Sequence, residues 1–268
     1  MEDSSQTSST INLQNVDDTV WGFARRQWWR MAIVIALAFI IGYFNLVLGF
    51  AVAFFGIYLL KIAYERSLFG AFASSNGFRF MKTGTLSDQT GFVFNLGNSR
   101  SYSDIITGTY EQWPFELFIY SYTVGYGKES QSYNRATMTI NFSVALPSFV
   151  LLHGSLAGDL DNNLRDVKEA GYSVRVSLEG DFDKHLRLQV RPGSEIDVLS
   201  ILSPDVLELL EGLDKYELEI SDNGQFHVYT KNFITTKQEL IDLYQIVGKI
   251  IPKIGNFANR QRTLHQRG

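Results

Sequence analysis

A run of thirty uncharged residues, Met31 to Leu60, constrains this sequence more than any other feature. A helix needs about 20 apolar residues to cross the hydrocarbon core of a bilayer, and uncharged runs longer than about 18 residues are typical of membrane spans. A buried core helix would carry polar breaks every few residues, and a cleaved signal peptide has an apolar region about half as long. The run therefore predicts a membrane segment.

The run fits two short helices better than one long helix. A single helix of this length would measure about 45 Å and would tilt by about 50° to fit a core of about 30 Å. It would also place Asn45 in the middle of the membrane, where a polar amide is costly. Two helices over 28–43 and 46–63 would instead place Asn45 in a tight turn at the far face. Because the first of these helices is short for a span, a single span stays open as the alternative.

Aromatic and basic residues flank the run on both sides. Trp28 and Trp29 precede it, in the position of an interfacial aromatic belt, and Arg30 and Lys61 bracket it. Since cytoplasmic flanks are rich in Lys and Arg, this pattern predicts a transmembrane hairpin over 24–66 with both ends in the cytoplasm. We assign Trp28, Trp29, Arg30, Asn45 and Lys61 as the anchor of a multi-pass cell-membrane protein whose partner is the lipid bilayer.

Both ends of the chain differ in composition from the middle. Residues 1–23 are rich in Ser, Thr and acidic residues, which predicts a disordered acidic tail. Residues 255–268 form a basic tail, in which Arg260, Arg262 and Arg267 are candidates for contact with an anionic membrane surface.

Composition excludes several classes of function. The formal net charge is -4, so nothing points to nucleic acid as a partner. The chain has no Cys, which excludes disulfides, zinc–thiolate sites, iron–sulfur clusters and Cys nucleophiles. We predict no cofactor, no metal and no catalytic residue.

The rest of the chain alternates strand and helix patterns. We expect a linker over 67–76 and a soluble domain over 77–254, with a division into two halves near 155–171 as an alternative. The candidate strands cover 78–81, 91–96, 105–110, 115–124, 136–144, 149–152, 172–178, 186–190, 216–221 and 225–229. The candidate helices cover 195–202, a stretch that begins at Ser203, and a last stretch that begins at Thr236. This order predicts an α+β fold with a mostly antiparallel sheet, short helices and a C-terminal helix.

Particular side chains sharpen these expectations. The strand at 115–124 is apolar on both faces, whereas 136–144 alternates and predicts a half-buried strand with Thr137 and Thr139 facing outward. Asn223 lies in the strongest hairpin signal of the chain. Glu239, three residues after Thr236, completes a capping box for the last helix. The apolar stripe of that helix consists of Leu240, Tyr244, Val247, Ile251 and Ile254.

Five segments carry a resemblance to known proteins: 107–133, 146–152, 179–190, 194–210 and 216–229. They contain a Gly-aromatic strand pair, a Leu-Pro corner, a Gly-x-Phe segment before a strand and a short helix that opens with Ser-Pro. Together they resemble a bacterial family of membrane-anchored domains of unknown function, such as uncharacterised proteins of the Saccharibacteria and other candidate phyla. The resemblance implies a one- or two-pass anchor followed by a soluble domain, and it implies no catalytic residues.

The motifs of known chemistry are incomplete. The glycine loop at 125–128 lacks the flanking residues of a phosphate loop, and the acidic stretch at 159–163 lacks the Gly and Glu of a calcium loop. Asp181, Asp183 and His185 lie close together in the sequence and suit general acid–base chemistry. We therefore expect a membrane-anchored, non-enzymatic binding or scaffold domain with a protein partner. The alternative is a membrane-bound hydrolase in which these three residues share a deep polar pocket.

Overall fold

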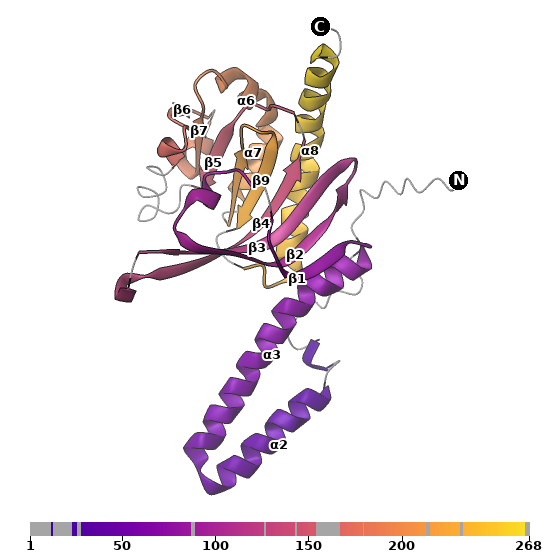
Figure 1. Ribbon diagram of the computed structural model, residues 1–268, viewed down its shortest axis with the longest axis vertical. Helices are drawn as coiled ribbons and strands as arrows, with labels where there is room; N and C mark the ends of the chain where they lie inside the picture. The colour runs from indigo at the N-terminus through magenta and orange to yellow at the C-terminus, as the bar shows by residue number, and fades with distance from the viewer. Residues whose placement is uncertain are drawn as a thin grey trace, which may run out of the picture. The chain divides into compact units, whose positions relative to one another are not determined.

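The computed structural model describes residue 12 and residues 23–265, apart from 26–27, 87–88, 126, 143, 154–166, 179, 213–214 and 231–232 (Figure 1). The chain divides into two compact units. One comprises Met81–Phe233 and Ile241–Gly268, and the other comprises Ile11–Phe80 and Ile234–Leu240.

The N-terminal unit contains a helical hairpin made of α2 (Trp28–Phe44) and α3 (Leu46–Ser75). The predicted turn at Asn45 is confirmed, because this single residue joins the two helices. Its backbone is extended, and its side chain accepts a hydrogen bond from the backbone N–H of Leu48 at 3.2 Å. Asn45 thus caps α3 by supplying an acceptor to an otherwise unpaired amide of the first helical turn.

Small residues bring α2 and α3 close together. A Cβ atom on Gly49 would lie 2.6 Å from the Cα atom of Gly42, and a Cβ atom on Gly56 would overlap the Cγ1 atom of Val34. Both positions therefore require glycine. Close backbone approach at small residues is typical of helix pairs in membranes, where no hydrophobic force drives helices together.

Most of the apolar surface of the hairpin is exposed. No side chain of α2 is buried, and most of the large apolar side chains of α3 are exposed as far as Leu59. Among the described residues, one helix, Leu46–Asn76, is long and apolar enough to cross a membrane, and only 17% of its apolar window is buried. Helix α2 is a shorter apolar helix of 17 residues.

The linker that we expected at 67–76 was wrong, because α3 continues to Ser75. Leu68 and Phe72 lie one turn apart and are buried, and the rings of Phe72 and Phe78 lie 5.8 Å apart. The apolar residues of this segment therefore form a helical face, which favours helix over an irregular connection.

Within its described residues, the C-terminal part of the chain forms a nine-stranded sheet of order β1-β2-β3-β4-β9-β8-β5-β7-β6. Its strands are β1 (Arg79–Gly84), β2 (Asn98–Tyr110), β3 (Trp113–Val124), β4 (Gln131–Asn141), β5 (Phe149–His153), β6 (Val174–Val176), β7 (Leu186–Val190), β8 (Tyr216–Ile220) and β9 (Gln225–Thr230). The helices beside it are η1 (Val93–Asn95), η2 (Gly127–Glu129), α5 (Phe182–His185), α6 (Glu195–Ile201), α7 (Pro204–Glu211) and α8 (Lys237–His265). In the order of the sheet, each strand from β2 across to β6 pairs antiparallel with its neighbour. This sheet and helix α8 confirm the predicted α+β class and the predicted C-terminal helix.

The division into two halves near 155–171 was wrong for the sheet. The hairpin β8–β9 lies between β4 and β5, so that β9 pairs with β4 and β8 pairs with β5. One continuous sheet therefore includes strands from both sides of the expected boundary. Most of the boundary segment, 155–171, lies outside the described residues.

One face of this sheet is apolar and is covered by α8. Two rows of facing side chains cross the sheet, and both are buried: Phe115, Ile140, Phe226, Ile220, Phe149 and Val190, and next to them Leu117, Met138, Val228, Leu218, Leu151 and Leu188. The ring of Tyr244 on α8 lies 6.5 Å from that of Phe115. The predicted stripe of α8 is buried throughout. The helix continues through Pro252 to His265, so the expected basic tail is helical over 255–265.

The opposite face is covered by the segment around η1. Phe92, Phe94, Phe118 and Tyr120 belong to one buried cluster on this side. Two predictions were wrong here. The expected strand at 91–96 is a short 3-10 helix, and the two threonines expected to face outward, Thr137 and Thr139, are buried. Both errors have one cause: this segment packs on the sheet instead of joining it, and so removes the face from water.

Candidate functional site

A line of polar side chains crosses the face that η1 covers. Neighbouring strands place Glu116, Thr139, His227, Glu219 and Gln189 in one row, with Val150 between the last two. Thr139, His227, Glu219 and Gln189 are buried. Since a buried polar group is costly without hydrogen bonds, the partners of this row determine what it can do.

Glu219 is the centre of the row and is fully buried. Its carboxylate accepts hydrogen bonds from the hydroxyl of Tyr172 at 2.7 Å and from the hydroxyl of Tyr229 at 2.6 Å. The backbone N–H of Phe92 donates to both oxygens, at 2.9 and 3.1 Å. Burial raises the pKa of Glu219 to about 7, although these donors favour the charged form. The carboxyl group therefore titrates near neutral pH.

Gly91 lies directly against this carboxylate. A Cβ atom at this position would lie 2.6 Å from the hydroxyl oxygen of Tyr229 and 2.8 Å from Oε2 of Glu219. Only glycine leaves room for the backbone to pass so close. This explains why the chain can place the N–H of Phe92 on the carboxylate.

His227 lies beside Glu219 and is buried in a neutral state. Its Nδ1 atom lies 2.9 Å from the hydroxyl of Thr139, and that hydroxyl donates to Oε1 of Gln89 at 3.0 Å. Because the single hydroxyl proton is used in this way, Nδ1 of His227 is the donor. The ring stacks on Tyr229 at 5.6 Å, and burial lowers the pKa of His227 to about 3. His227 is thus a fixed hydrogen-bond donor within the core.

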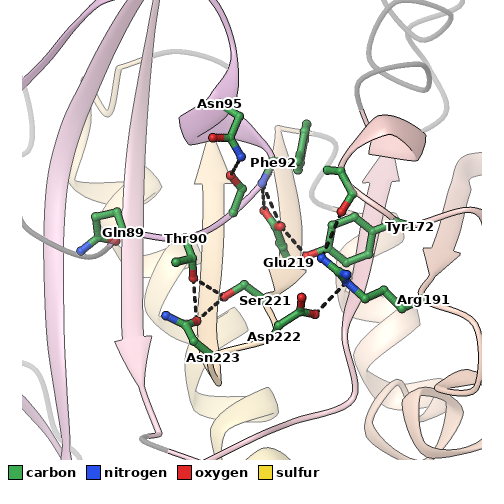
Figure 2. Close-up of a pocket in the computed structure, with 12 residues that line it drawn as sticks. Gln89, Thr90, Phe92, Asn95, Tyr172, Arg191, Glu219, Ser221, Asp222 and Asn223 are labelled. Carbon is green, nitrogen blue, oxygen red and sulfur yellow. Dashed lines mark hydrogen bonds and ion pairs between the residues drawn. The ribbon is translucent and has the colours of Figure 1, made fainter.

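A cavity of about 290 Å³ opens next to Glu219, at the turn of the β8–β9 hairpin (Figure 2). It is lined by Gln89, Thr90, Gly91, Phe92, Asn95, Ala170, Tyr172, Arg191, Glu219, Ser221, Asp222 and Asn223. On one side Arg191 lies 5.2 Å from the ring of Tyr172 and forms an ion pair with Asp222 at 2.7 Å. Arg191 also donates to the carbonyl of Ala170 at 3.0 Å.

The other side of the cavity is a network of neutral groups. The hydroxyl of Thr90 donates to the side-chain carbonyl of Asn223 at 2.6 Å, and the hydroxyl of Ser221 donates to the same oxygen at 2.8 Å. The backbone N–H of Thr90 donates to the side chain of Gln225 at 2.9 Å. Figure 2 shows Thr90, from the segment before η1, next to Ser221 and Asn223 of the hairpin turn.

The carboxylates that we considered for acid–base chemistry do not come together with His185. Asp183 accepts hydrogen bonds from the backbone of Leu178 at 3.1 Å and from Ser177 at 2.9 Å, and its pKa is lowered chiefly by the first of these. Asp181 instead pairs with Lys184 at 2.7 Å.

His185 lies 3.6 Å from Glu211 and is half-exposed. None of the residues Asp181, Asp183 and His185 lines the cavity beside Glu219. The cavity beside Glu219 is therefore built from other residues than the hydrolase alternative requires.

The predicted anchor residues lie on the helical hairpin. Trp28 and Trp29 are exposed at the start of α2, and the guanidinium of Arg30 lies 5.1 Å from the ring of Trp29. Asn45 is the turn and Lys61 lies within α3.

Two of the three predicted surface arginines belong to α8. Arg260 lies 5.7 Å from the ring of Phe257, and Arg262 follows it in the same helix. Arg267 lies outside the described residues, as does most of the predicted tail over 1–23.

The sequence patterns missed Glu219, Tyr172, Gly91 and Arg191. In the strand Tyr216–Ile220, Glu217 and Glu219 alternate with apolar residues, which is typical of a strand with one face in water. Both carboxylates are buried instead. The neighbouring strand Phe149–His153 is almost entirely apolar, but no local signal in the sequence shows that it pairs with this strand.

No family model matches this chain, and no curated protein matches it. A solved structure that matches is the crystal structure of the mycobacterial trehalose monomycolate transport factor A, TtfA. It has 9% sequence identity and a TM-score of 0.40, and the match covers 73% of this chain and 93% of that chain. At this TM-score the likeness does not establish a shared fold.

Proposed function

We propose that this chain is a membrane-anchored, non-enzymatic binding protein. In this proposal α2 and the first part of α3 form a transmembrane hairpin, and the sheet domain binds a ligand in the cavity beside Glu219. The supporting observation is the apolar surface between Trp28 and Leu59, which is exposed along both helices. Soluble monomers rarely expose apolar patches larger than a few hundred Å², whereas a bilayer covers such a surface.

The dimensions of the hairpin agree with this proposal. Helix α2 has 17 residues and measures about 25 Å, a few ångströms less than a typical hydrocarbon core. Its first two residues, Trp28 and Trp29, would lie in the headgroup layer, and Asn45 would lie in the opposite layer. Basic residues on both outer flanks support a topology in which both ends of the chain and the sheet domain lie in the cytoplasm.

The chemistry of the cavity favours binding over catalysis. The carboxylate of Glu219 is saturated by three donors, Arg191 is paired with Asp222, and His227 is held neutral inside the core. A general base needs a free lone pair that faces the substrate, and a nucleophile needs such a base within hydrogen-bond reach. The oxygens of Glu219 accept from donors within the fold, and His227 is fully buried and does not line the cavity. We also propose membership of the membrane-anchored family that the sequence resembles.

The hairpin is tested by extraction and by topology. We expect the full chain to stay in the membrane pellet after alkaline carbonate extraction. Phe54→Lys should release a large share of it, since Phe54 is 74% exposed on α3 and would carry a charge into the bilayer. Ile196→Lys is the matched control, because Ile196 is 85% exposed on α6 and should have no effect on extraction.

Reporter fusions at residue 1 and after Gly268 should both report the cytoplasm. A chain that is fully extracted would contradict membrane insertion. A C-terminal reporter on the far side, with the other in the cytoplasm, would replace the hairpin by a single span.

A further inference from the structure

The cavity beside Glu219 combines ionic groups that are already neutralised with neutral groups that have bonding capacity left. We propose that it binds a neutral, polyhydroxylated ligand of about the size of one sugar ring, such as a monosaccharide or a cyclic polyol. This inference rests on the proposed function, because it names the ligand class of the same site.

The charges of the cavity argue against an ionic ligand. The negative charge of Glu219 is shared among Tyr172, Tyr229 and the N–H of Phe92, and the carboxylate is fully buried. An ammonium group or a metal ion would have to displace those donors. The guanidinium of Arg191 is held by Asp222 at 2.7 Å and by the carbonyl of Ala170 at 3.0 Å. An anion would therefore have to compete with a carboxylate that is already in place.

The remaining groups of the lining match hydroxyl groups. Asn223 uses its side-chain carbonyl for Thr90 and Ser221, which leaves its NH₂ group as a donor. Asn95 uses its NH₂ group for the carbonyl of Gly91 at 3.3 Å, which leaves its side-chain oxygen as an acceptor. Among the described residues, Asn223 thus offers the cavity a donor and Asn95 offers it an acceptor. A hydroxyl group can satisfy either kind, because it donates one hydrogen bond and accepts two.

The ion pair of Arg191 and Asp222 adds a further acceptor for a hydroxyl group. One oxygen of Asp222 lies 2.7 Å from Nε of Arg191 and accepts a hydrogen bond from Ser148 at 2.8 Å, and no described residue donates to its second oxygen. A carboxylate oxygen that faces a neutral hydroxyl makes a strong, charge-assisted hydrogen bond without a net change of charge in the site. Asp222 is therefore the group that we expect to contribute most to affinity.

The volume sets the size of the ligand. A cavity of about 290 Å³ lies at the lower end of the range of small-molecule pockets. A single ring with its hydroxyl groups suits this space, whereas a peptide or a lipid chain does not.

The test is ligand binding by the full chain in phospholipid nanodiscs, where no sugar-based detergent competes. Saturation-transfer NMR would use methyl α-glucoside, N-acetylglucosamine and myo-inositol as neutral probes, with glucosamine and glucuronate as charged probes. We expect at least one neutral probe to bind with millimolar or better affinity, and the charged probes to bind more weakly. Asp222→Asn should weaken binding by about tenfold, the cost of one charge-assisted hydrogen bond.

Ser200→Ala on α6 is the matched control, since Ser200 is exposed and bonds only within its own helix. It should leave binding unchanged. Asn223→Ala, checked for an unchanged circular dichroism spectrum, is a second variant that should also reduce binding. Tighter binding of a charged probe, or no binding of any neutral probe by a membrane-inserted chain, would overturn the ligand class and leave the anchor intact. A chain that is fully extracted by carbonate would instead overturn the proposed function.

Discussion

The hydroxyl of Tyr229 donates to the carboxylate of Glu219 at 2.6 Å, between the two strands of the β8–β9 hairpin. Tyr172 and the N–H of Phe92 bind the same carboxylate, so one buried group joins three segments that are far apart in the sequence. The loop before η1, the segment after the turn at Gly171 and the hairpin therefore share one electrostatic partner. The protonation of Glu219 is coupled to the packing of the whole face.

This coupling predicts that Glu219 makes the free energy of unfolding depend on pH. Burial raises its pKa from 4.5 to about 7, so the folded chain binds this proton more tightly than the unfolded chain. The contribution of Glu219 to the free energy of unfolding is largest below pH 4.5, and it falls by about 3 kcal/mol as the pH rises to 7. His227 acts in the opposite direction, because its pKa is lowered from 6.5 to about 3 and its contribution grows over that range.

A comparison with Glu219→Gln separates the two groups. Urea denaturation of both chains between pH 4 and pH 8 gives the difference in free energy of unfolding between wild type and variant. We expect this difference to fall by about 3 kcal/mol between pH 4.5 and pH 7. The contribution of His227 cancels in the difference, since both chains contain it. A difference that does not change with pH would show that Glu219 keeps an ordinary pKa.

Gly91→Ala should destabilise the sheet domain by about 1–3 kcal/mol, the usual cost of inserting a carbon atom into a packed site. The new Cβ atom would overlap the hydroxyl of Tyr229 and the carboxylate of Glu219. Gly212→Ala is a suitable control, because its Cβ atom would lie 3.6 Å from its nearest neighbour. Thermal denaturation measures both variants. Equal melting temperatures would contradict the close approach at Gly91.

Arg135 and Glu217 form a buried ion pair at 2.7 Å, and Arg135 also donates to the hydroxyl of Tyr122. We expect Glu217→Leu alone to cost about 3–5 kcal/mol, because it leaves a buried guanidinium without its partner. The double variant Arg135→Met with Glu217→Leu should recover most of that loss. Urea denaturation of the single and double variants decides this. A double variant as unstable as the single one would mean that the pair itself stabilises the fold.

Two glycines of the hairpin provide a matched test of how its helices pack. Gly49→Ala should push α2 and α3 apart, because its Cβ atom would lie 2.6 Å from the backbone of Gly42. Gly42→Ala should be tolerated, since its Cβ atom would lie 3.7 Å from Gly49. The chain has no native Cys, so spin labels at Met31→Cys and Ile57→Cys can report the separation of the helices. Equal separations in both variants would contradict the close contact.

The C-terminal arginines are expected to contact an anionic membrane. Each Lys or Arg near such a surface contributes about 1 kcal/mol, and the contribution fades beyond about 8 Å. A fluorophore on Asn256→Cys, in the full chain in nanodiscs, should be quenched by headgroup-attached quenchers only when the lipids are anionic. High salt, or the combined change of Arg260, Arg262 and Arg267 to Gln, should relieve the quenching. Quenching that ignores lipid charge would contradict this contact.

Local patterns predicted the elements whose signals lie within a few residues. The capping box of α8 is present: Oε2 of Glu239 accepts from the N–H of Thr236 at 3.1 Å, and the N–H of Glu239 donates to Oγ1 of Thr236 at 3.2 Å. The hairpin around Asn223 is present as well. These features need only neighbouring residues, so the sequence contains all the information that they require.

The candidate site could not be predicted in this way. Glu219 gains its partners from Phe92 and Tyr172, which lie far away in the sequence. Alternation in its strand describes which residues share a face, but it does not say what covers that face. Nothing near Gly91 in the sequence shows that its backbone lies against the carboxylate of Glu219. The polar groups of the pocket were therefore visible in the sequence, and their convergence was not.

The place of the β8–β9 hairpin between β4 and β5 has a consequence for the order of folding during synthesis. Strand β4 ends at Asn141, and its partner β9 begins only at Gln225. Until that partner leaves the ribosome, one edge of β4 has unpaired N–H and C=O groups, and such an edge is a template for pairing with another chain. The growing chain is thus most exposed to aggregation over this interval. A pause in translation before Gln225 would lengthen that exposure, whereas a pause after β9 has left the ribosome would come when the sheet can already close.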